Sequence, residues 1–400
     1  MELFERLAYY GQATILSIFL RDHLHFTEQE VGNISSVFGG LIYFLPIFAG
    51  TIADKIGFRK AFSIAFSVLA IGYFLIGSTG IAASSPLYDG LPLFWVLIVF
   101  VILTAMGGSF IKPSVLGTVA VTSRPETKSL GYGVYYWLVN IGAFFGPVIA
   151  NAVRKNVGIE FVYLVSALSC AAMLAVNLLF YREVKDEAAH VAESLGTKLK
   201  NMVVVLANFR FILFLLVFSL YWIMFWSGFY VVLPFYITDY IDRTADFEYV
   251  LSVGALGIIL LQLPVNRLTK GLATKHAILL GFFVSSLCFL VAALTHSLLV
   301  IMLGILIWSV GEMIQAPRYY EYISTLAPPG QQALFQGYAF LPIAIAWLVG
   351  GWFGGRIYTA YGKEGGDPGV VWWIFLGIGM LATFLMFLYN RFVRVEEARA

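Results

Sequence analysis

The chain has 400 residues, of which 60% are hydrophobic and only 12% are charged. A water-soluble protein of this length needs far more charge to cover its surface, so the composition excludes that class and predicts a multi-spanning membrane protein. The formal net charge of +2 says little about partners, because the positions of the charges matter more than their sum. Cys170 and Cys288 each lie within a long apolar segment, which argues against a disulfide framework, a zinc site or a redox pair.

Apolar windows of about 20 residues, separated by charged or Gly/Pro-rich breaks, predict an all-α membrane protein with twelve transmembrane helices. The first apolar run is expected to be a span and not a signal peptide, because no small-residue cleavage site follows it. The predicted spans are 1–20, 30–52, 60–80, 92–120, 130–153, 159–181, 210–238, 247–266, 276–295, 298–325, 333–361 and 370–390.

The longest polar break, "YREVKDEAAHVAESLGTKLKN", divides these spans into two equal groups. It predicts an N-terminal six-helix bundle at 1–182, a partly helical linker at 183–209 and a C-terminal six-helix bundle at 210–400. Lys and Arg number 16 in the loops on the side of the N-terminus and 6 in the opposite loops. Because basic residues accumulate in cytoplasmic loops, both termini are predicted to be cytoplasmic.

The two halves of the sequence resemble each other faintly. "ADKIGFRKAF" follows the second span and "VNRLTKGLATKHA" follows the eighth, and both are basic and contain glycine. "GGSFIKPSV" in the fourth span and "GEMIQAPRYY" in the tenth each place a proline shortly after a glycine. Two parallel six-helix halves are typical of a rocking transporter, whose site lies between the halves near mid-membrane.

The first span begins with charged residues, in "MELFERLAYYG". The apolar run 7–20 has only 14 residues, about 21 Å of helix against a hydrocarbon core of about 30 Å, so the span must include residues 1–6. Glu2, Glu5 and Arg6 then share one helical face at membrane depth, where charges must pair or face a water-filled cavity. The alternative is that both acids lie at a helix N-terminus on the membrane surface, where they suit the helix macrodipole.

Two more charged residues lie deep in predicted spans: Lys112 in "LTAMGGSFIKPSVLGTVA" and Glu312 in "IWSVGEMIQAPRYY". Lys112 is too far from either end of its span to reach the surface, so it needs a carboxylate, which the first span offers. Arg318 and Glu321, spaced i and i+3, are expected to form a local ion pair. With cations in the first half and Glu312 in the second, a cavity would suit a zwitterion with an amino group at one end and a carboxylate at the other.

Several motifs along the chain resemble those of one known family. "ELFERLAYYG" is similar to an E-x-x-E-R-F-x-Y-Y-G signature, "YFLPIFAGTIADKIGFRK" to a second helix with its gating loop, and "GGSFIKPSV" to a fourth-helix G-x-x-K-P motif. "YYWLVNIG" resembles a fifth-helix motif, and "YWIMF" and "GEMIQAPRYYEYISTLAP" resemble a seventh and a tenth helix. In this order, the motifs resemble those of the proton-coupled oligopeptide transporters, a branch of the major facilitator superfamily.

The resemblance implies roles for the charged residues. Glu2, Glu5, Arg6 and Lys112 would form the proton-coupling cluster, exchanging ion pairs as protons arrive. Arg6 and Lys112 would also receive the carboxylate of a peptide substrate. Glu312 would receive the amino terminus of that peptide.

The resemblance also implies polar contacts and a gate. Tyr10, Tyr43 and Asn140 would hydrogen-bond the peptide backbone. Asp54 with Arg59 would latch the cytoplasmic gate in the outward-open state.

The sequence departs from the family's pattern at several positions. Trp226 and Ser227 stand where the seventh-helix motif usually has an acid and a Gln. Ala13 replaces a frequent second arginine, and Ala255 stands where an eighth-helix asparagine is expected. Bacterial members commonly carry two extra central helices, for which this chain has no room. These departures concern the substrate site and leave the expected fold and coupling to protons unchanged.

The resemblance implies a proton-coupled symporter that imports di- and tripeptides by alternating access, as a monomer, in a bacterial inner (plasma) membrane. The proton gradient would drive it, so no cofactor or metal and no nucleic-acid partner is expected. Two alternatives are a carrier of another small zwitterion or anion, such as an amino acid or peptide-like metabolite, and a non-transporting membrane receptor. An enzyme is not expected, because no His lies deep in a span and no Ser–His or metal-ligand constellation appears.

Overall fold

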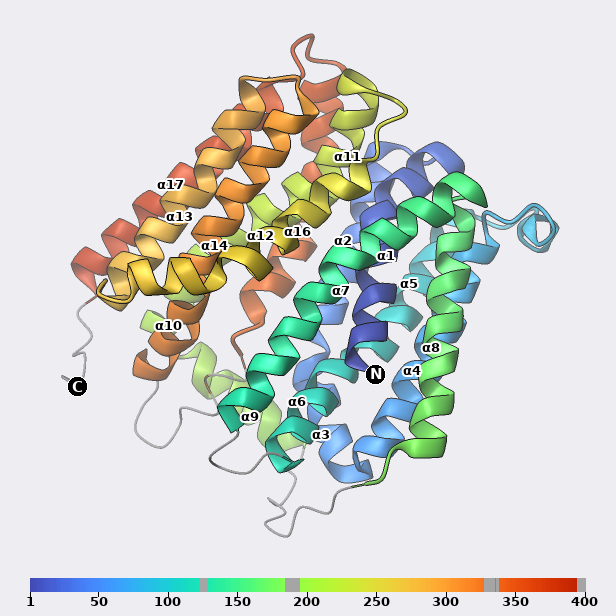
Figure 1. Ribbon diagram of the computed structural model, residues 1–400, viewed down its shortest axis with the longest axis horizontal. Coiled ribbons are helices and arrows are strands. Elements are labelled where there is room, and N and C mark those ends of the chain that lie inside the picture. Colours follow the sequence, from blue (N-terminus) through green and yellow to red (C-terminus); the bar gives the residue numbers. More distant parts are fainter. Residues whose placement is uncertain (123–127, 184–194, 327–334, 336–337, 394–400) are drawn as a thin grey trace. The chain divides into compact units, whose positions relative to one another are not determined.

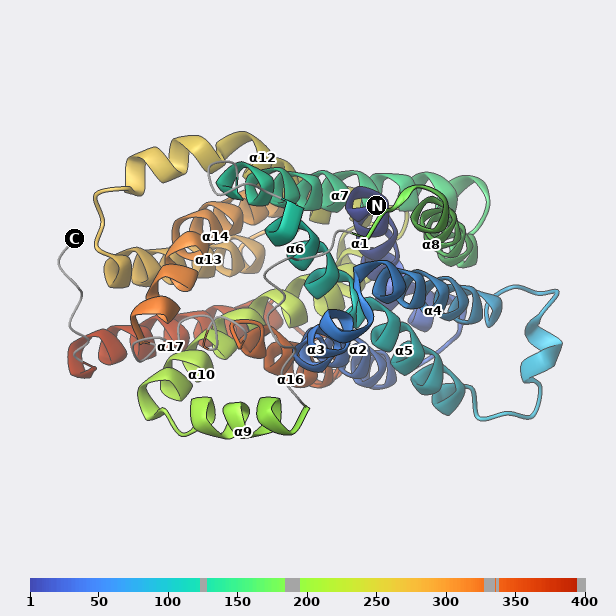
Figure 2. The same cartoon turned by 90° about the horizontal axis from the view of Figure 1, so that it is seen from below.

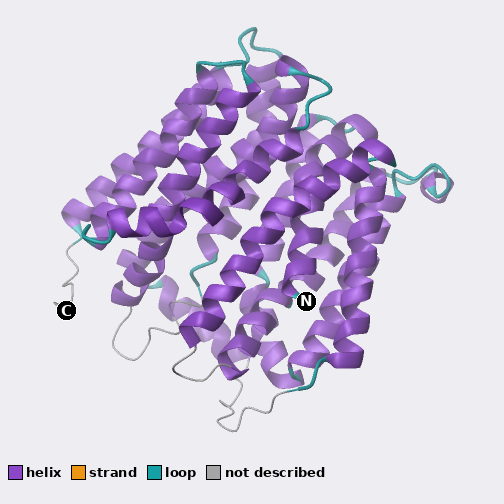
Figure 3. Cartoon of the chain, viewed as in Figure 1, coloured by secondary structure: helices purple, strands orange, loops and turns teal. Residues whose placement is uncertain are grey.

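The structure, a computed structural model, is helical in every regular element that it describes (Figure 3). The chain divides into two compact units, Met1–Lys198 and Leu199–Ala400, whose order along the sequence can be followed by colour in Figure 1. The all-α membrane fold expected from the composition is therefore confirmed. The described residues are 1–122, 128–183, 195–326, 335 and 338–393.

In the first unit, α1 packs against α7 and α8, and α4 packs against α5 and α8 (Figure 2). A π-helical turn, η1, extends α1 at its C-terminal end. The elements of this unit are α1 (Glu2–Ile18), η1 (Phe19–His23), α2 (Glu28–Phe44), α3 (Pro46–Ile56), α4 (Phe58–Ser78), η2 (Ser85–Tyr88), α5 (Leu93–Ser109), α6 (Ile111–Thr122), α7 (Lys128–Asn156) and α8 (Glu160–Phe180).

In the second unit, α13 packs against α14 and α17, and α10 packs against α16 and α17. Three further π-helical segments, η4, η5 and η6, interrupt or extend its helices. The elements are α9 (Leu195–Leu206), within which the boundary between the units falls, α10 (Phe209–Phe225), η4 (Trp226–Val232), α11 (Leu233–Tyr236), η5 (Ile237–Ile241), α12 (Phe247–Thr269), α13 (Thr274–Ala293), α14 (Leu298–Leu326), α16 (Leu341–Ile357), η6 (Tyr358–Lys363) and α17 (Val370–Phe392).

The second predicted span is bent, not straight. Thr27 and Glu30 form a capping box that starts α2, in which each side chain accepts a backbone N–H of the other residue. Pro46 then begins α3, because proline lacks the N–H that would continue the hydrogen bonding of α2. The two helices meet at an angle of 45°. Gly57, with a φ of +87° that favours glycine, ends α3 and leads directly into α4.

Glycines allow α1 and α7 to approach closely. A methyl group added at Gly142 would lie 2.3 Å from the Cβ of Arg6, and one added at Gly146 would lie 2.8 Å from the carbonyl oxygen of Leu7. Gly11 of α1 faces Gly146 in turn. Small residues bring membrane helices into direct backbone contact, so α7 fixes the position of the charged start of α1.

Nine of the described helical stretches are long and apolar enough to cross a membrane, or ten if the bent α2–α3 pair counts as one span. α1 and α16, which correspond to the first and eleventh predicted spans, have only 17 helical residues each. The count of twelve spans and the cytoplasmic termini therefore stay predictions. Part of the predicted linker, 184–194, lies outside the described residues, whereas its later part contains α9.

Candidate proton and substrate site

The charged start of α1 forms a buried ionic cluster. Glu2, Glu5 and Arg6 have relative exposures of 8%, 2% and 5%. Arg6 donates to the Glu5 carboxylate, and its Nε lies 3.2 Å from Oε1 of Glu2, one turn back on the helix. Both acids lie in the first turn of α1, as the alternative expected, but they are buried and not exposed. Since a buried ion pair is costly to break by removing one partner, the three residues behave as a unit.

Lys112 joins this cluster from α6. Its ammonium lies within electrostatic reach of Arg6, Glu2 and Glu5, so the structure brings together the four residues assigned to proton coupling. The Lys112 Nζ also lies 4.2 Å from the centre of the Tyr43 ring, a cation–π geometry. Helix α6 begins after a break at Phe110 between α5 and α6, within the fourth predicted span.

The polar side chains expected to bind a peptide backbone lie on three helices of the first unit. Tyr10 is on α1 within electrostatic reach of Arg6, and Tyr43 is buried on α2. Asn140, on α7, has a relative exposure of 7% and donates its amide to the Tyr136 carbonyl at 2.9 Å. Their roles in binding stay predictions.

Two further tyrosines, Tyr9 and Tyr135, lie beside the cluster. The Tyr9 ring lies 5.2 Å from the guanidinium carbon of Arg6, and Tyr9 is the hydrogen-bonding neighbour of Tyr43. Tyr135 reaches Arg6 electrostatically from α7. Both lie inside quoted motifs, "LAYYG" and "YYWLVNIG", so the signal was present although no role was assigned to them.

Glu312 lies half-buried on α14 in the second unit. Its surroundings are aromatic: it is within electrostatic reach of Tyr221 and Tyr320, and Trp308 lies one helical turn earlier. Arg318 pairs with Glu321 at 2.8 Å, as expected, and not with Glu312. In the described part of the second unit, no base forms an ion pair with Glu312.

The aromatic surroundings of Glu312 continue into η4, which contains two of the positions that depart from the expected motifs. Trp226 and Ser227 are buried in η4, and the Trp226 ring stacks on Trp347 at 4.6 Å between ring centres. Phe225 stacks on Trp308 at 5.2 Å. This part of the second unit is therefore a packed aromatic cluster.

The two predicted gate residues lie near the end of α3 and the start of α4. Asp54 and Arg59 are both exposed. The Arg59 guanidinium donates to the Leu178 carbonyl at 2.6 Å, which ties α4 to α8. The Glu183 carboxylate, which follows α8, accepts the backbone N–H groups of Phe58 and Arg59 at 2.8 and 2.7 Å. Glu183 thus caps α4 at its positive end, a role that sequence reasoning missed.

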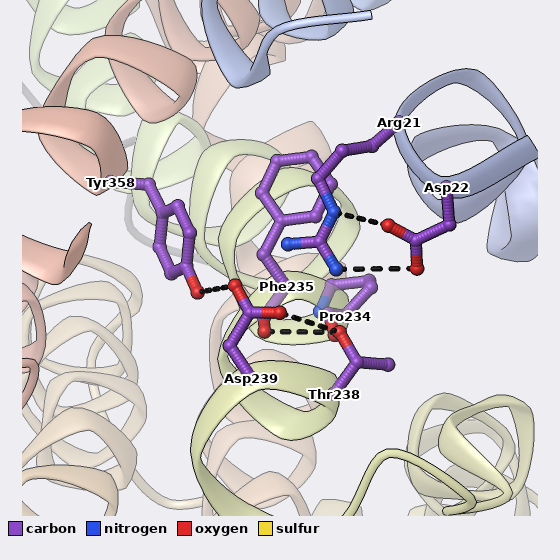
Figure 4. A network of polar contacts seen from close by, with 7 residues as sticks. All are labelled: Arg21, Asp22, Pro234, Phe235, Thr238, Asp239 and Tyr358. Atoms are coloured by element: carbon purple, nitrogen blue, oxygen red, sulfur yellow. Dashed lines mark hydrogen bonds and ion pairs between the residues drawn. The ribbon is translucent and has the colours of Figure 1, made fainter. Parts of the chain in front are cut away.

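A further polar network joins η5 to η6 in the second unit (Figure 4). The Tyr358 hydroxyl donates to Asp239 Oδ2 at 2.5 Å, and Tyr240 donates to the Gly362 carbonyl. In the first unit, Arg21 and Asp22 of η1 form a separate ion pair at 2.6 Å (Figure 4). π-Helical turns occur frequently at functional sites, so the region around η5 and η6 is a candidate functional region of this unit.

Comparison with known proteins identifies the family. The family model described as the Major Facilitator Superfamily matches residues 2–245, more than half of the chain. The chain belongs to the major facilitator superfamily. It is a transporter and not an enzyme, and with its many apolar helices it is a multi-pass integral protein of a bacterial inner membrane. Among the described residues, no group of three or more His, Cys, Asp or Glu side chains could hold a metal ion.

Curated relatives include two kinds of bacterial transporter. Dipeptide and tripeptide permease A of Pectobacterium carotovorum is 27% identical over 210 residues, which cover 52% of this chain and 39% of the permease. Multidrug resistance protein MdtH of Klebsiella pneumoniae is 24% identical over 347 residues, which cover 85% of this chain and 80% of that protein. The chain thus matches well under half of the length of the permease.

Solved structures share the fold. A POT family transporter in complex with a thioalcohol-conjugated peptide aligns with a TM-score of 0.76 at 19% identity, over 98% of this chain and 94% of that one. A nucleoside transporter aligns with a TM-score of 0.76 at 15% identity, over 97% and 98% of the two chains. The permeases among these relatives agree with the oligopeptide-transporter resemblance of the motifs, and the POT structures show the shared fold.

Proposed function

We propose that the protein is a proton-coupled symporter that imports di- and tripeptides by alternating access. The observation that carries this proposal is the buried cluster of Glu2, Glu5 and Arg6, with Lys112 in electrostatic reach. Paired acids and bases at membrane depth mark ion and proton pathways. The dipeptide and tripeptide permeases among the relatives support a peptide substrate.

The cluster suggests how a proton and a peptide are coupled. A proton that binds the Glu5 carboxylate removes its charge and releases Arg6 from that ion pair. The guanidinium, which still lies beside Glu2, then binds the carboxylate of the peptide together with Lys112. When the peptide leaves, Arg6 needs an anion again, and Glu5 gives up its proton to supply one. In each state Arg6 keeps an anionic partner, so neither the proton nor the peptide crosses efficiently alone.

The peptide's ammonium is proposed to bind Glu312, which pairs with no base in the described second unit. The aromatic side chains around it lower the local polarity, which would strengthen an ionic contact there. Tyr10, Tyr43 and Asn140 would hydrogen-bond the peptide backbone. No cofactor is needed, because the proton gradient supplies the driving force.

Uptake into proteoliposomes tests this function. Labelled dialanine, alanine and the lipophilic cation ethidium would each be offered to the purified protein with and without an inward proton gradient. We expect the gradient to drive accumulation of dialanine above its external concentration. Liposomes without protein, and a proton ionophore added to the loaded vesicles, serve as controls.

The other outcomes identify the alternatives. Accumulation of alanine but not dialanine would indicate a carrier of another small zwitterion. Proton-driven movement of ethidium alone would place the protein with its multidrug-resistance relatives. No movement of any probe by folded protein would favour a non-transporting receptor. Each of these results would overturn the peptide proposal.

A further inference from the structure

An apolar groove runs along the outside of the second unit, between α10, α16 and α17. Its volume is about 540 Å³. Part of its lining is open, since Leu216 and Phe392 have relative exposures of 51% and 77%. Its lining includes Leu213, Leu216, Ile223, Tyr389, Phe392 and Val393.

The length of the groove corresponds to one leaflet of a bilayer. Its lining on α10 runs from Leu213 to Ile223, ten residues along the helix and about 15 Å. The hydrocarbon core of a bilayer is about 30 Å thick, so one leaflet contributes about half of that. An acyl chain that enters from one membrane surface would therefore reach the end of the groove near the bilayer centre.

One end of the groove is basic. The Tyr389 hydroxyl, in the lining, donates to the backbone carbonyl of Arg210 at 3.1 Å, which places Arg210 at this end. Arg391 is exposed and immediately precedes Phe392. The Lys275 Nζ donates to the carbonyl of Val393, also in the lining, at 3.2 Å.

Acidic side chains do not cancel this charge in the described residues around the groove. Glu321, which accepts a hydrogen bond from Thr274 beside Lys275, is already paired with Arg318 at 2.8 Å. The distribution of Lys and Arg predicts that this end faces the cytoplasm, where the leaflet is rich in anionic lipids.

We propose that this groove binds an anionic phospholipid of the cytoplasmic leaflet. One acyl chain lies along α10 and α17, and the phosphate lies against Arg210, Arg391 and Lys275. Apolar length and basic end together select this occupant: a zwitterionic lipid would bring its own cation beside the bases, and a soluble phosphate would leave the groove empty. The proposal does not depend on which substrate the protein transports.

Native mass spectrometry of the full chain in detergent tests the site. Dioleoyl phosphatidylglycerol and dioleoyl phosphatidylcholine share their acyl chains, so the difference in affinity of the first bound lipid reports the headgroup. We expect phosphatidylglycerol to bind more tightly. Each base near an anionic lipid contributes about fivefold, so Arg210→Gln with Arg391→Gln should weaken its binding roughly 30-fold.

Two controls locate the binding. Arg267→Gln with Lys270→Gln removes as many charges from the end of α12 and should leave binding unchanged. Leu216→Trp should weaken both lipids by filling the groove, whereas Leu168→Trp, at an exposed position on α8, should weaken neither. Circular dichroism and size-exclusion elution verify that each variant is folded. Equal affinity for the two lipids, equal losses for the two pairs of Arg or Lys substitutions, or an unaffected Leu216→Trp variant would each overturn the proposal.

Discussion

The two units handle charge in opposite ways. In the first unit, Glu2, Glu5 and Arg6 share one short stretch of α1 and pair with each other. In the second unit, Glu312 pairs with no base among the described residues of that unit and has aromatic neighbours. In a paired cluster, a carboxylate can take up a proton and release its basic partner. A carboxylate that has aromatic neighbours and no paired base is suited to a cationic ligand. From this difference we propose proton coupling in the first unit and ammonium recognition in the second.

The two sites also differ in how they are packed. Backbone-to-backbone contact through Gly142 and Gly146 holds the ionic cluster, which leaves little freedom for α1. Stacked rings such as Trp226 on Trp347 surround the second site. Aromatic side chains can shift individually, whereas a substitution between α1 and α7 must separate two helices. We therefore expect substitutions at the first site to be less tolerated than substitutions at the second.

The largest effect is expected from Glu5→Gln. The variant keeps the shape of the side chain but cannot carry a proton to and from a carboxylate. Accumulation driven by a pH gradient should be abolished, while counterflow exchange of labelled for unlabelled peptide continues, because exchange needs no net proton movement. Both rates would be measured in the same proteoliposomes. Full gradient-driven accumulation by the variant would break the assignment of coupling to the first unit.

Glu312→Gln should instead weaken substrate binding. Truncating one member of a desolvated charge pair typically costs 2–5 kcal/mol, on the order of 30-fold or more in affinity. A dipeptide should therefore lose much more affinity than its N-acetylated analogue, which has no ammonium. Binding of both ligands would be compared on folded wild type and variant. Equal losses for the two would remove the amino-terminus role from the second unit.

Gly142→Ala tests the rigidity of the first site. The added methyl group would meet the Cβ of Arg6 at 2.3 Å, so α1 and α7 must separate. Overpacking of this kind typically costs about 1–3 kcal/mol of stability, and the displaced Arg6 should also slow transport. Gly133→Ala lies on the same helix with open space around it and is the matched control. Equal thermal stability of the two variants would contradict the close approach of α1 and α7.

Asp54→Asn is expected to have the smallest effect. Asp54 is exposed at the end of α3, whereas the ionic cluster is buried, so it should act on the gate and not on the ligand. Removing its charge should shift the population toward the inward-open state and slow transport, with peptide affinity kept within a few-fold. Turnover and affinity would be measured separately. Normal turnover with a large loss of affinity would move Asp54 into the substrate site.

Much of the fold could be predicted from hydrophobic patterning. The sixth predicted span, 159–181, corresponds closely to α8, and the twelfth, 370–390, to α17. The bend within the predicted second span, 30–52, was not predicted. A proline in an apolar run indicates a possible break in the helix but does not give its angle. The pairing of Glu2 with Arg6 was also predictable, since a spacing of i and i+4 brings the two side chains together on one helical face.

Contacts between distant helices could not be predicted in the same way. Glu183 lies 125 residues from Phe58, whose backbone N–H it accepts, and no local pattern connects the two. Likewise, the hydrogen bond from Tyr358 to Asp239 depends on two π-helical turns, which hydrophobic periodicity does not reveal. Such contacts follow from tertiary packing, which a single sequence leaves open.

The central claim is that proton entry accompanies peptide entry through the cluster on α1. It is tested most directly with wild-type protein in proteoliposomes that contain a pH-sensitive dye and have no initial pH gradient. Adding dialanine outside should acidify the lumen as peptide enters, whereas N-acetyldialanine, which lacks the ammonium for Glu312, should produce a much smaller change. Peptide entry without acidification of the lumen would contradict proton coupling.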